Sequence, residues 1–222
     1  MHLLKSSVGK KLLMAVSGQL MILFVIIHGI GNSMVYFGRL NAYAAELHSL
    51  PVLVWASRLG LAAAFLFHLY LGIGLTLENH RAKKEGYAVS SSLQTTFAAK
   101  NMIWSGAVIG VFLMYHLLHF TFQVISPETS ARLHMDALGR PDVTSMVAAG
   151  FQHFSVALIY IAAMTALVLH LTQGIQSSIQ TLGLNNDRTF PVIRKTGSVI
   201  AFILFLGYIS IPVVIFLGMV KG

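Results

Sequence analysis

Residues 12–37, LLMAVSGQLMILFVIIHGIGNSMVYF, form a mostly apolar stretch that contains one histidine, His28. About 20 such residues are needed for a helix to cross the hydrocarbon core of a bilayer. The stretch therefore predicts a membrane-spanning helix, and it is too long to be the core of a cleaved signal peptide. Four further stretches have the same character, at about 51–77, 101–125, 146–175 and 196–220.

The composition of the whole chain agrees with a membrane protein. Of 222 residues, 56% are hydrophobic and only 10% are charged, against roughly a quarter charged in soluble domains. We expect an all-α integral membrane protein that forms one membrane domain over residues 1–222. The chain has no cysteine, which excludes an iron–sulfur cluster, a disulfide and a thioether-linked haem on it. No convincing internal repeat is evident.

Basic residues predict the topology. With the N-terminus inside, ten Lys and Arg residues flank the spans on the cytoplasmic side and five on the other side. This asymmetry favours a cytoplasmic N-terminus and a C-terminus outside. It also accounts for the formal charge of +8 without a nucleic-acid partner. The connector 40–50 has apolar residues at helical spacing and predicts a short helix along the outer interface.

Four histidines lie one apiece in the first four spans, at two predicted depths. Counted at ~1.5 Å per residue, His28 and His116 lie roughly 23 Å from the cytoplasmic edge. His68 and His170 lie roughly 8–14 Å from that edge. Histidine inside a membrane is costly and points to function. The equal depths predict two pairs, His28 with His116 and His68 with His170, roughly 10–15 Å apart in depth.

Such pairs suit two b-type haems, because each iron takes two axial imidazoles from facing helices. We therefore predict the four paired histidines as ligands of haem iron. Gly72 and Gly174, four residues after two of them, are predicted to make room for a porphyrin. The alternative for any single histidine is one cross-helix hydrogen bond. His119 and His153 are rivals as ligands; we favour His116 over His119 because its depth matches that of His28.

The ordered set of segments resembles a known family. Residues 6–32 (SSVGKKLLMAVSGQLMILFVIIHGIGN), 68–75 (HLYLGIGL), 112–122 (FLMYHLLHFTF) and 169–183 (LHLTQGIQSSIQTLG) are similar to the five-helix, dihaem cytochrome b subunit of succinate dehydrogenase and fumarate reductase. The resemblance covers essentially the whole chain. It implies the same four ligands, paired first with third and second with fourth, and two haem b groups.

The resemblance also implies partners and a location. Such a subunit anchors an FAD-bearing flavoprotein and an iron–sulfur protein, and it exchanges electrons with a quinone, often menaquinone. It is the electron-transfer part of an oxidoreductase in the bacterial inner (cytoplasmic) membrane, with dicarboxylate chemistry on the partners. Whether the whole complex is a dimer stays open. The predicted docking surface is the basic inner face, which consists of Lys10, Lys11, Arg81, Lys83 and Lys84.

The quinone site is predicted near the outer end. A quinol releases protons on oxidation, so its site needs a carboxylate or an imidazole. Glu46 is the predicted proton acceptor, with His48 beside it and Arg39, Asn41 and Tyr43 as weaker candidates from the same connector.

Two positions in the second and fourth spans are also informative. Arg58 is predicted either to contact a propionate of the outer haem or to extend to the interface. Val168 stands where some members of the resembling family have a glutamate proposed to carry protons, so proton transfer by that route is not expected here.

Two other functions remain as alternatives. One is the quinone-reactive cytochrome b anchor of a different respiratory dehydrogenase, which would differ in its partner subunits. The other is a haem-free transporter or proton channel that uses the histidines as a relay.

Overall fold

The computed structural model describes residues 4–82 and 96–220, and in these ranges five helices are long and apolar enough to cross a membrane. They are α1 (Ser7–Asn32), α3 (Pro51–Ala82), α5 (Met102–His116), α7 (Phe154–Thr181) and α8 (Phe190–Phe216). The 3₁₀ turn η1 (Ser33–Phe37) continues α1, and the π-helical turn η2 (Leu117–Thr121) continues α5. The shorter elements are α2 (Leu40–His48), α4 (Phe97–Lys100), η3 (Pro127–Thr129) and α6 (Val143–Gln152). The chain is a multi-pass helical membrane protein.

Local signals in the sequence account for several helix ends. The Ser6 hydroxyl accepts a hydrogen bond from the Gly9 amide and caps α1, and the Asp142 carboxylate caps α6 in the same way. Such caps satisfy amides that have no partner inside the helix. Pro191 lies in the first turn of α8, where a missing amide costs nothing. Gly183, with φ of +72°, follows the end of α7, as is common after helices.

The predicted fourth span is wrong at its start. Residues 146–175 were expected to form one helix, but the backbone is extended at His153 and separates α6 from α7. The spanning helix is α7, which runs on to Thr181, so the connector before α8 is shorter than predicted. His153 is exposed at this junction. The helix expected in the connector 40–50 is confirmed as α2.

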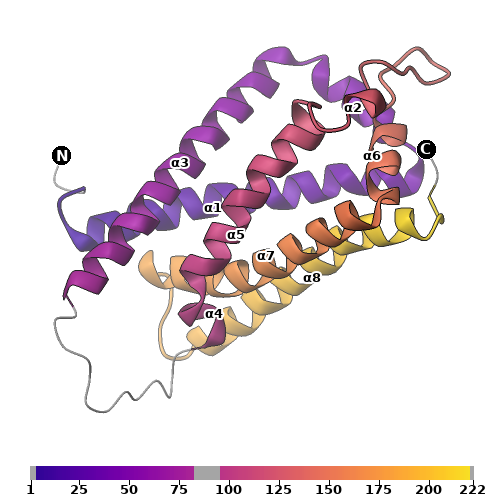
Figure 1. Cartoon of the computed structure of the whole chain (residues 1–222). Coiled ribbons are helices and arrows are strands. Elements are labelled where there is room, and N and C mark those ends of the chain that lie inside the picture. The colour runs from indigo at the N-terminus through magenta and orange to yellow at the C-terminus, as the bar shows by residue number, and fades with distance from the viewer. Residues whose placement is uncertain (1–3, 83–95, 221–222) are drawn as a thin grey trace.

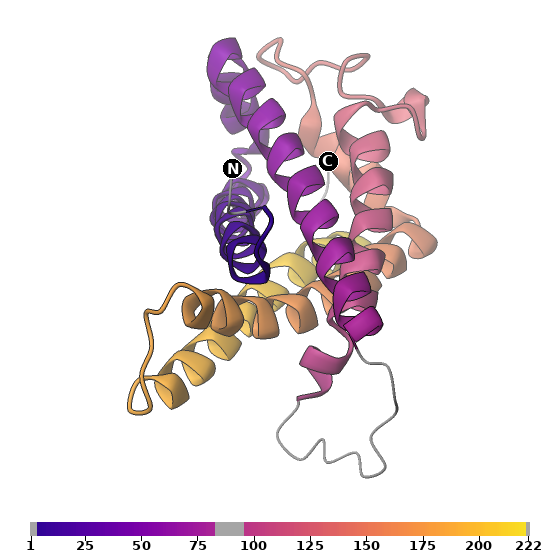
Figure 2. The same ribbon diagram turned by 90° about the vertical axis from the view of Figure 1, so that its left-hand side faces the viewer.

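The long helices form a splayed bundle. In Figure 1 the start of α1 and the end of α8 lie at opposite ends of the molecule. Figure 2, which looks along α1, shows α7 and α8 together below α1, α3 and α5. The most extensive packing joins α7 to α8, α1 to α3, and α7 to α5 and α1. In this bundle α1 packs against α3 and α7, and α7 also packs against α5, so that these four helices surround a common interior.

Apolar clusters and a few polar contacts hold the helices together. Leu171, Ile175 and Ala201 form a buried cluster between α7 and α8. Hydrogen bonds also cross between helices: the Gln19 amide donates to the Ser178 hydroxyl at 2.5 Å, and the Tyr208 hydroxyl donates to the carbonyl of Val25 at 2.6 Å. Both bonds start or end on α1, which is thereby tied to α7 and α8.

Candidate functional site

The four predicted histidines meet in two pairs inside the bundle. The ring centroids of His28 on α1 and His116 on α5 are 5.9 Å apart. Those of His68 on α3 and His170 on α7 are 6.4 Å apart. The partners are the ones that equal depth predicted. We call them the outer pair (His28 and His116) and the inner pair (His68 and His170).

The two pairs lie at different levels along the bundle. On α1, the inner pair is level with Ser17, which contacts His68, and the outer pair includes His28. On α5, the corresponding residues are Ser105, which contacts His170, and His116. The separation is 11 residues on both helices, or about 16 Å. This is slightly more than the depth difference expected from the sequence.

The inner histidines are held by matched polar contacts. The His68 Nδ1 lies 3.1 Å from the Ser17 hydroxyl and 3.2 Å from the Met14 carbonyl oxygen. On the other side, the His170 Nδ1 lies 3.1 Å from the Ser105 hydroxyl. All three contacts are to Nδ1, which leaves Nε2 of each ring for another partner.

The outer histidines have unlike surroundings. The Tyr160 hydroxyl of α7 lies 3.2 Å from the His116 Nδ1, so this ring also keeps Nε2 for another partner. In His28 the contact is instead between Nε2 and the Asn32 amide, at 3.2 Å. The His28 ring stacks on Phe24, with centroids 5.3 Å apart. Asn32 must therefore release Nε2 before that nitrogen can bind a metal.

His119, the rival of His116, is buried and turned toward α6. Its side chain is only 5% exposed and sits in the π-helical turn η2. The His119 Nδ1 lies 3.3 Å from the Tyr160 hydroxyl, and its ring stacks on Phe120. A side chain on Gly150 of α6 would come within 3.2 Å of the His119 ring. The ring that contacts His28 is that of His116, in agreement with the preference based on depth.

The ring separation of each pair is compatible with a bis-imidazole metal site. An imidazole nitrogen binds a metal at about 2 Å, so two rings on opposite sides of one ion have centroids about 6 Å apart. The measured separations, 5.9 and 6.4 Å, match this value. In the described ranges no three His, Cys, Asp or Glu side chains group as a metal site. A haem iron needs only two ligands from the protein, since the porphyrin supplies the other four.

The glycines next to the paired rings are not the predicted ones. Gly72 has no neighbouring heavy atom near the place of a side chain, and Gly174 faces only Met102. Gly18 and Gly106 are the close ones, because a side chain there would come within 3.4 Å of the His68 ring and 3.3 Å of the His170 ring. The sequence analysis missed these two glycines and the serines that precede them. Each serine and glycine nevertheless ends the short pattern Met-x-x-Ser-Gly.

The two main quinone candidates are on α2, where the weaker candidate Tyr43 packs against Gly31 of α1. Glu46 and His48 are exposed on α2, and the His48 Nδ1 lies 2.8 Å from the carbonyl oxygen of Ala44 in its own helix. Arg58 is exposed on α3 with its guanidinium 5.4 Å from the Trp55 ring centre. These positions agree with groups that face lipid or the interface. The roles of Glu46 and His48 at a quinone site and of Arg58 at a haem propionate stay predictions.

Asn41, a weaker candidate, joins α2 to the start of α6. Its amide nitrogen donates to Asp142 at 3.0 Å and to Asp136 at 3.4 Å. Its carbonyl oxygen accepts from the amide and the hydroxyl of Thr144, at 2.8 and 2.9 Å. One side chain thus holds the outer connector against the helix that covers His119.

The same connector contains an ion pair with a clear dependence on pH. Arg140 donates to Asp136 at 2.8 Å, and this bond is the main reason that the pKa of Asp136 falls from 3.8 to about 2. A carboxyl whose pKa is lower in the folded than in the unfolded protein stabilises the fold at a pH above the unfolded-state pKa. This contribution is lost as the pH falls through the folded-state pKa.

We expect the difference in thermal stability between the wild type and an Arg140→Met variant to be constant above pH 5. The difference should shrink between about pH 4 and pH 2, as Asp136 takes up a proton in both proteins. Melting curves of detergent-solubilised protein at stepwise pH measure it. A difference that stays unchanged down to pH 2 would contradict this assignment.

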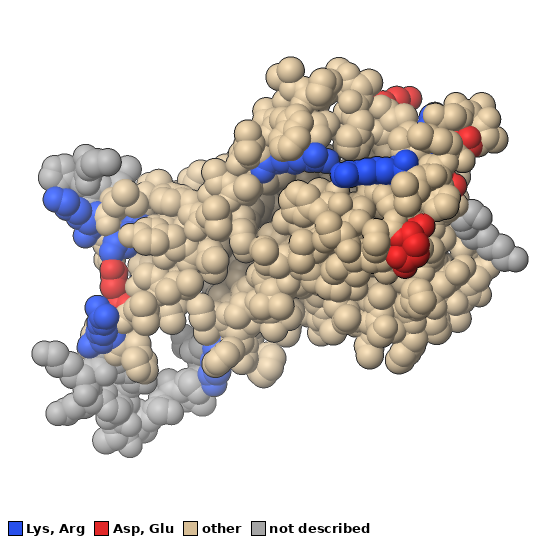
Figure 3. Space-filling view, turned by 45° about the horizontal axis from the view of Figure 1, so that its top comes forward, with Lys and Arg blue, Asp and Glu red and all other residues tan. Residues whose placement is uncertain are grey.

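Charged side chains gather at the ends of the molecule and in a short row on one side, as Figure 3 shows. At the end where α1 begins and α3 stops, Lys10 forms an ion pair with Glu78. The predicted docking surface is thus partly neutralised at Lys10, while Lys11 on α1 is exposed beside it. Lys83 and Lys84, also predicted to belong to it, lie outside the described residues.

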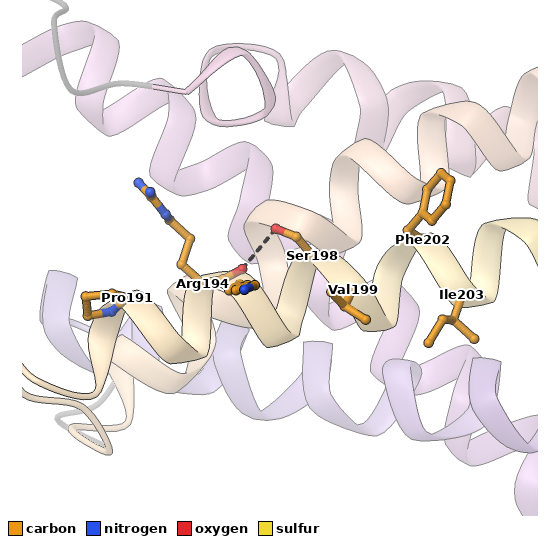
Figure 4. A pocket seen from close by; sticks show the side chains of 7 residues that line it. Pro191, Arg194, Ser198, Val199, Phe202 and Ile203 are labelled. Carbon is orange, nitrogen blue, oxygen red and sulfur yellow. Dashed lines mark hydrogen bonds between the residues drawn. The ribbon is translucent and has the colours of Figure 1, made fainter.

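A surface hollow of about 590 Å³ follows one face of α8 (Figure 4). Arg194 and Lys195 line its charged end, and Val199, Phe202 and Ile203 line the apolar part. The Ser198 hydroxyl is engaged by the Arg194 carbonyl of the same helix. All the lining residues belong to α8, and none of the four paired histidines is among them.

The fold and the site define a five-span helical membrane protein with two histidine pairs at two levels. Comparison with known proteins adds no name to this class, since no family model, no curated protein and no solved structure matches the chain.

Proposed function

We propose that this chain is the membrane-anchoring, dihaem cytochrome b subunit of a succinate:quinone or quinol:fumarate reductase. The observation that carries the proposal is the meeting of four intramembrane histidines in two pairs, each at the ring separation of a bis-imidazole iron site. The resemblance of the ordered segments to that family adds the identity of the complex. A haem held in each pair would supply a reversible one-electron carrier.

The residues around each pair have distinct tasks in this proposal. His68 and His170 present Nε2 because their Nδ1 atoms are engaged. Gly18 and Gly106 have no side chain, so the rings of His68 and His170 can lie directly against the helix backbone there. The apolar walls of the bundle exclude water. The separation of about 16 Å between the pairs divides the path of an electron across the membrane into shorter steps. Together these features hold two redox groups in line across the bilayer.

The orientation and the partners are part of the same proposal. The end that carries Lys10, Lys11 and Arg81 faces the cytoplasm, by the excess of basic residues. It docks the iron–sulfur protein and the flavoprotein. The opposite end, with Glu46 and His48 on α2, serves the quinone, and Glu46 accepts a proton from the quinol. The membrane is the cytoplasmic membrane of a bacterium.

The complex as isolated from its native membrane tests this function. We expect a flavoprotein and an iron–sulfur protein to copurify with the chain, and succinate to reduce its b-type absorption bands. A quinol should reduce the same bands in the chain stripped of its partners, whereas succinate should not. A hydrogenase or formate dehydrogenase among the copurifying proteins would replace this assignment by the anchor of another respiratory enzyme. A colourless preparation would contradict both.

A further inference from the structure

Two hairpins of the chain repeat the same pattern. The first helices, α1 and α5, share Met-x-x-Ser-Gly, then phenylalanine six residues after the glycine and histidine four residues after that. The matching residues are Met14, Ser17, Gly18, Phe24 and His28 in α1, and Met102, Ser105, Gly106, Phe112 and His116 in α5. The second helices, α3 and α7, share His-Leu-x-x-Gly-Ile, beginning at His68 and His170. The expectation that the chain has no internal repeat is wrong.

The contacts repeat with the pattern. In the first hairpin Ser17 of α1 contacts His68 of α3, and in the second Ser105 of α5 contacts His170 of α7. The glycine that follows each serine lies against the same histidine ring. Each hairpin therefore forms its own serine–histidine unit, and the two units face each other with ring centroids 6.4 Å apart.

The hydrogen bonds of the serines fix which ring nitrogen carries the proton. The Ser17 hydroxyl donates its one proton to the Met14 carbonyl at 3.0 Å, and the Ser105 hydroxyl donates to the Met102 carbonyl at 3.0 Å. With these bonds in place each hydroxyl oxygen accepts from the histidine, which makes Nδ1 of His68 and of His170 the donor. The Met14 carbonyl, which can only accept, lies 3.2 Å from the His68 Nδ1 and agrees with this tautomer. Nε2 of both rings is left with a free lone pair, the form of imidazole that binds a metal.

We propose that Ser17 and Ser105 are paired positioning residues that hold His68 and His170 in the metal-binding tautomer and lower the reduction potential of the inner centre. The proposal rests on the proposed function, since it concerns a haem held by the inner pair. A hydrogen bond from the distal N–H to an acceptor orients a ligating imidazole and makes it a stronger donor. A stronger donor favours the oxidised, more positively charged form of the iron.

The outer pair lacks this symmetry, so the two centres should differ. His116 is engaged by the phenol of Tyr160, whereas the His28 contact is on Nε2. Changes at the serines should therefore act on one centre and changes at Tyr160 on the other. This separation provides an internal control within one molecule.

Potentiometric titration of the purified complex, followed through the b-type bands, tests the proposal. In a Ser17→Ala/Ser105→Ala variant we expect one of the two titrating components to move to a more positive potential. Loss of the serine oxygens leaves the Met14 carbonyl as the remaining acceptor near the His68 Nδ1, and it should weaken the preference for the oxidised form by up to roughly tenfold, about 59 mV for one electron. The other component should stay in place. A Ser17→Thr/Ser105→Thr variant, which keeps both hydroxyls, should retain the wild-type value, and Tyr160→Phe should move the second component instead.

Ser57→Ala is the matched control, because the Ser57 hydroxyl donates to the Val54 carbonyl in the same local geometry on the outer half of α3. It should leave both components unchanged. Selective loss of the inner haem in the double variant, with the outer one retained, also supports the positioning role. Two haems with both potentials unchanged would overturn the inference and leave the proposed function intact. A wild type without haem would overturn the proposed function itself.

Discussion

Alanine at any one of the four paired histidines is expected to lower the haem content from two to one per chain. The four are His28, His68, His116 and His170. In the proposed dihaem protein each would be one of two protein ligands of its iron, and a b-type haem has no covalent link to hold it once a ligand is lost. The two pairs are about 16 Å apart along the helices, so loss at one level should leave the other occupied. The pyridine haemochrome assay on purified variants measures the ratio.

His119→Ala is the matched control for these variants. His119 is buried on the same segment as His116 and shares the Tyr160 hydroxyl with it, but the ring opposite His28 is that of His116. The control should retain two haems. If His119→Ala lost a haem while His116→Ala kept both, the outer ligand would be His119 and the geometry of the outer pair would be misassigned.

Asn41→Ala is expected to lower the free energy of unfolding by about 2–3 kcal/mol. The Asn41 side chain makes four hydrogen bonds, two of them to carboxylates, and they join α2 to the start of α6. Its removal takes one donor from Asp142, which keeps its two bonds from Ser145, and it leaves the amide and hydroxyl of half-buried Thr144 without their acceptor. Hydrogen bonds to charged groups are among the stronger ones in proteins, so the loss is a sizeable part of the net stability.

Denaturant titration in detergent, followed by circular dichroism, measures this effect. Asn101→Ala is the matched control, since Asn101 is also half-buried and donates to the Phe97 carbonyl in its own segment. It should cost less than about 1 kcal/mol. Equal losses in the two variants would show that Asn41 has no special part in holding the outer connector.

The pairing of the histidines was accessible from the sequence because a membrane restricts geometry so strongly. Spanning helices run alternately up and down, and each residue advances about 1.5 Å, so position in the sequence translates into depth. His28 could thereby be matched with His116 before any coordinates existed. The same reasoning does not predict where the side chains of Glu46 and Arg58 lie. A connector does not advance by a fixed rise per residue, and a long side chain near the interface can extend to different depths.

The break at His153 illustrates a second limit. Residues on both sides are apolar, so hydropathy extends the predicted span through them without interruption. The extended backbone at His153 turns α6 away from α7, and Phe151 and Ala148 of α6 pack in the buried cluster with Ile215 of α8. Tertiary packing of this kind overrides a local pattern.

Ser17 and Ser105 were missed for a different reason. A serine in a membrane helix usually bonds to a carbonyl one turn earlier, as both of these do, and that habit gives no sign of a partner on another helix. The repeat is present in the sequence, but its role is recognised only when the contacts align Ser17 with Ser105 and His68 with His170. The spacing of the two hairpins differs because their connectors differ in length.

If the two histidine pairs bind two haems, the visible spectrum of the purified, dithionite-reduced protein must show them. The account predicts sharp b-type bands and, from the same sample, two haems per polypeptide by the pyridine haemochrome assay. A correctly folded protein without these bands, even when it is produced with ample haem, would contradict the account.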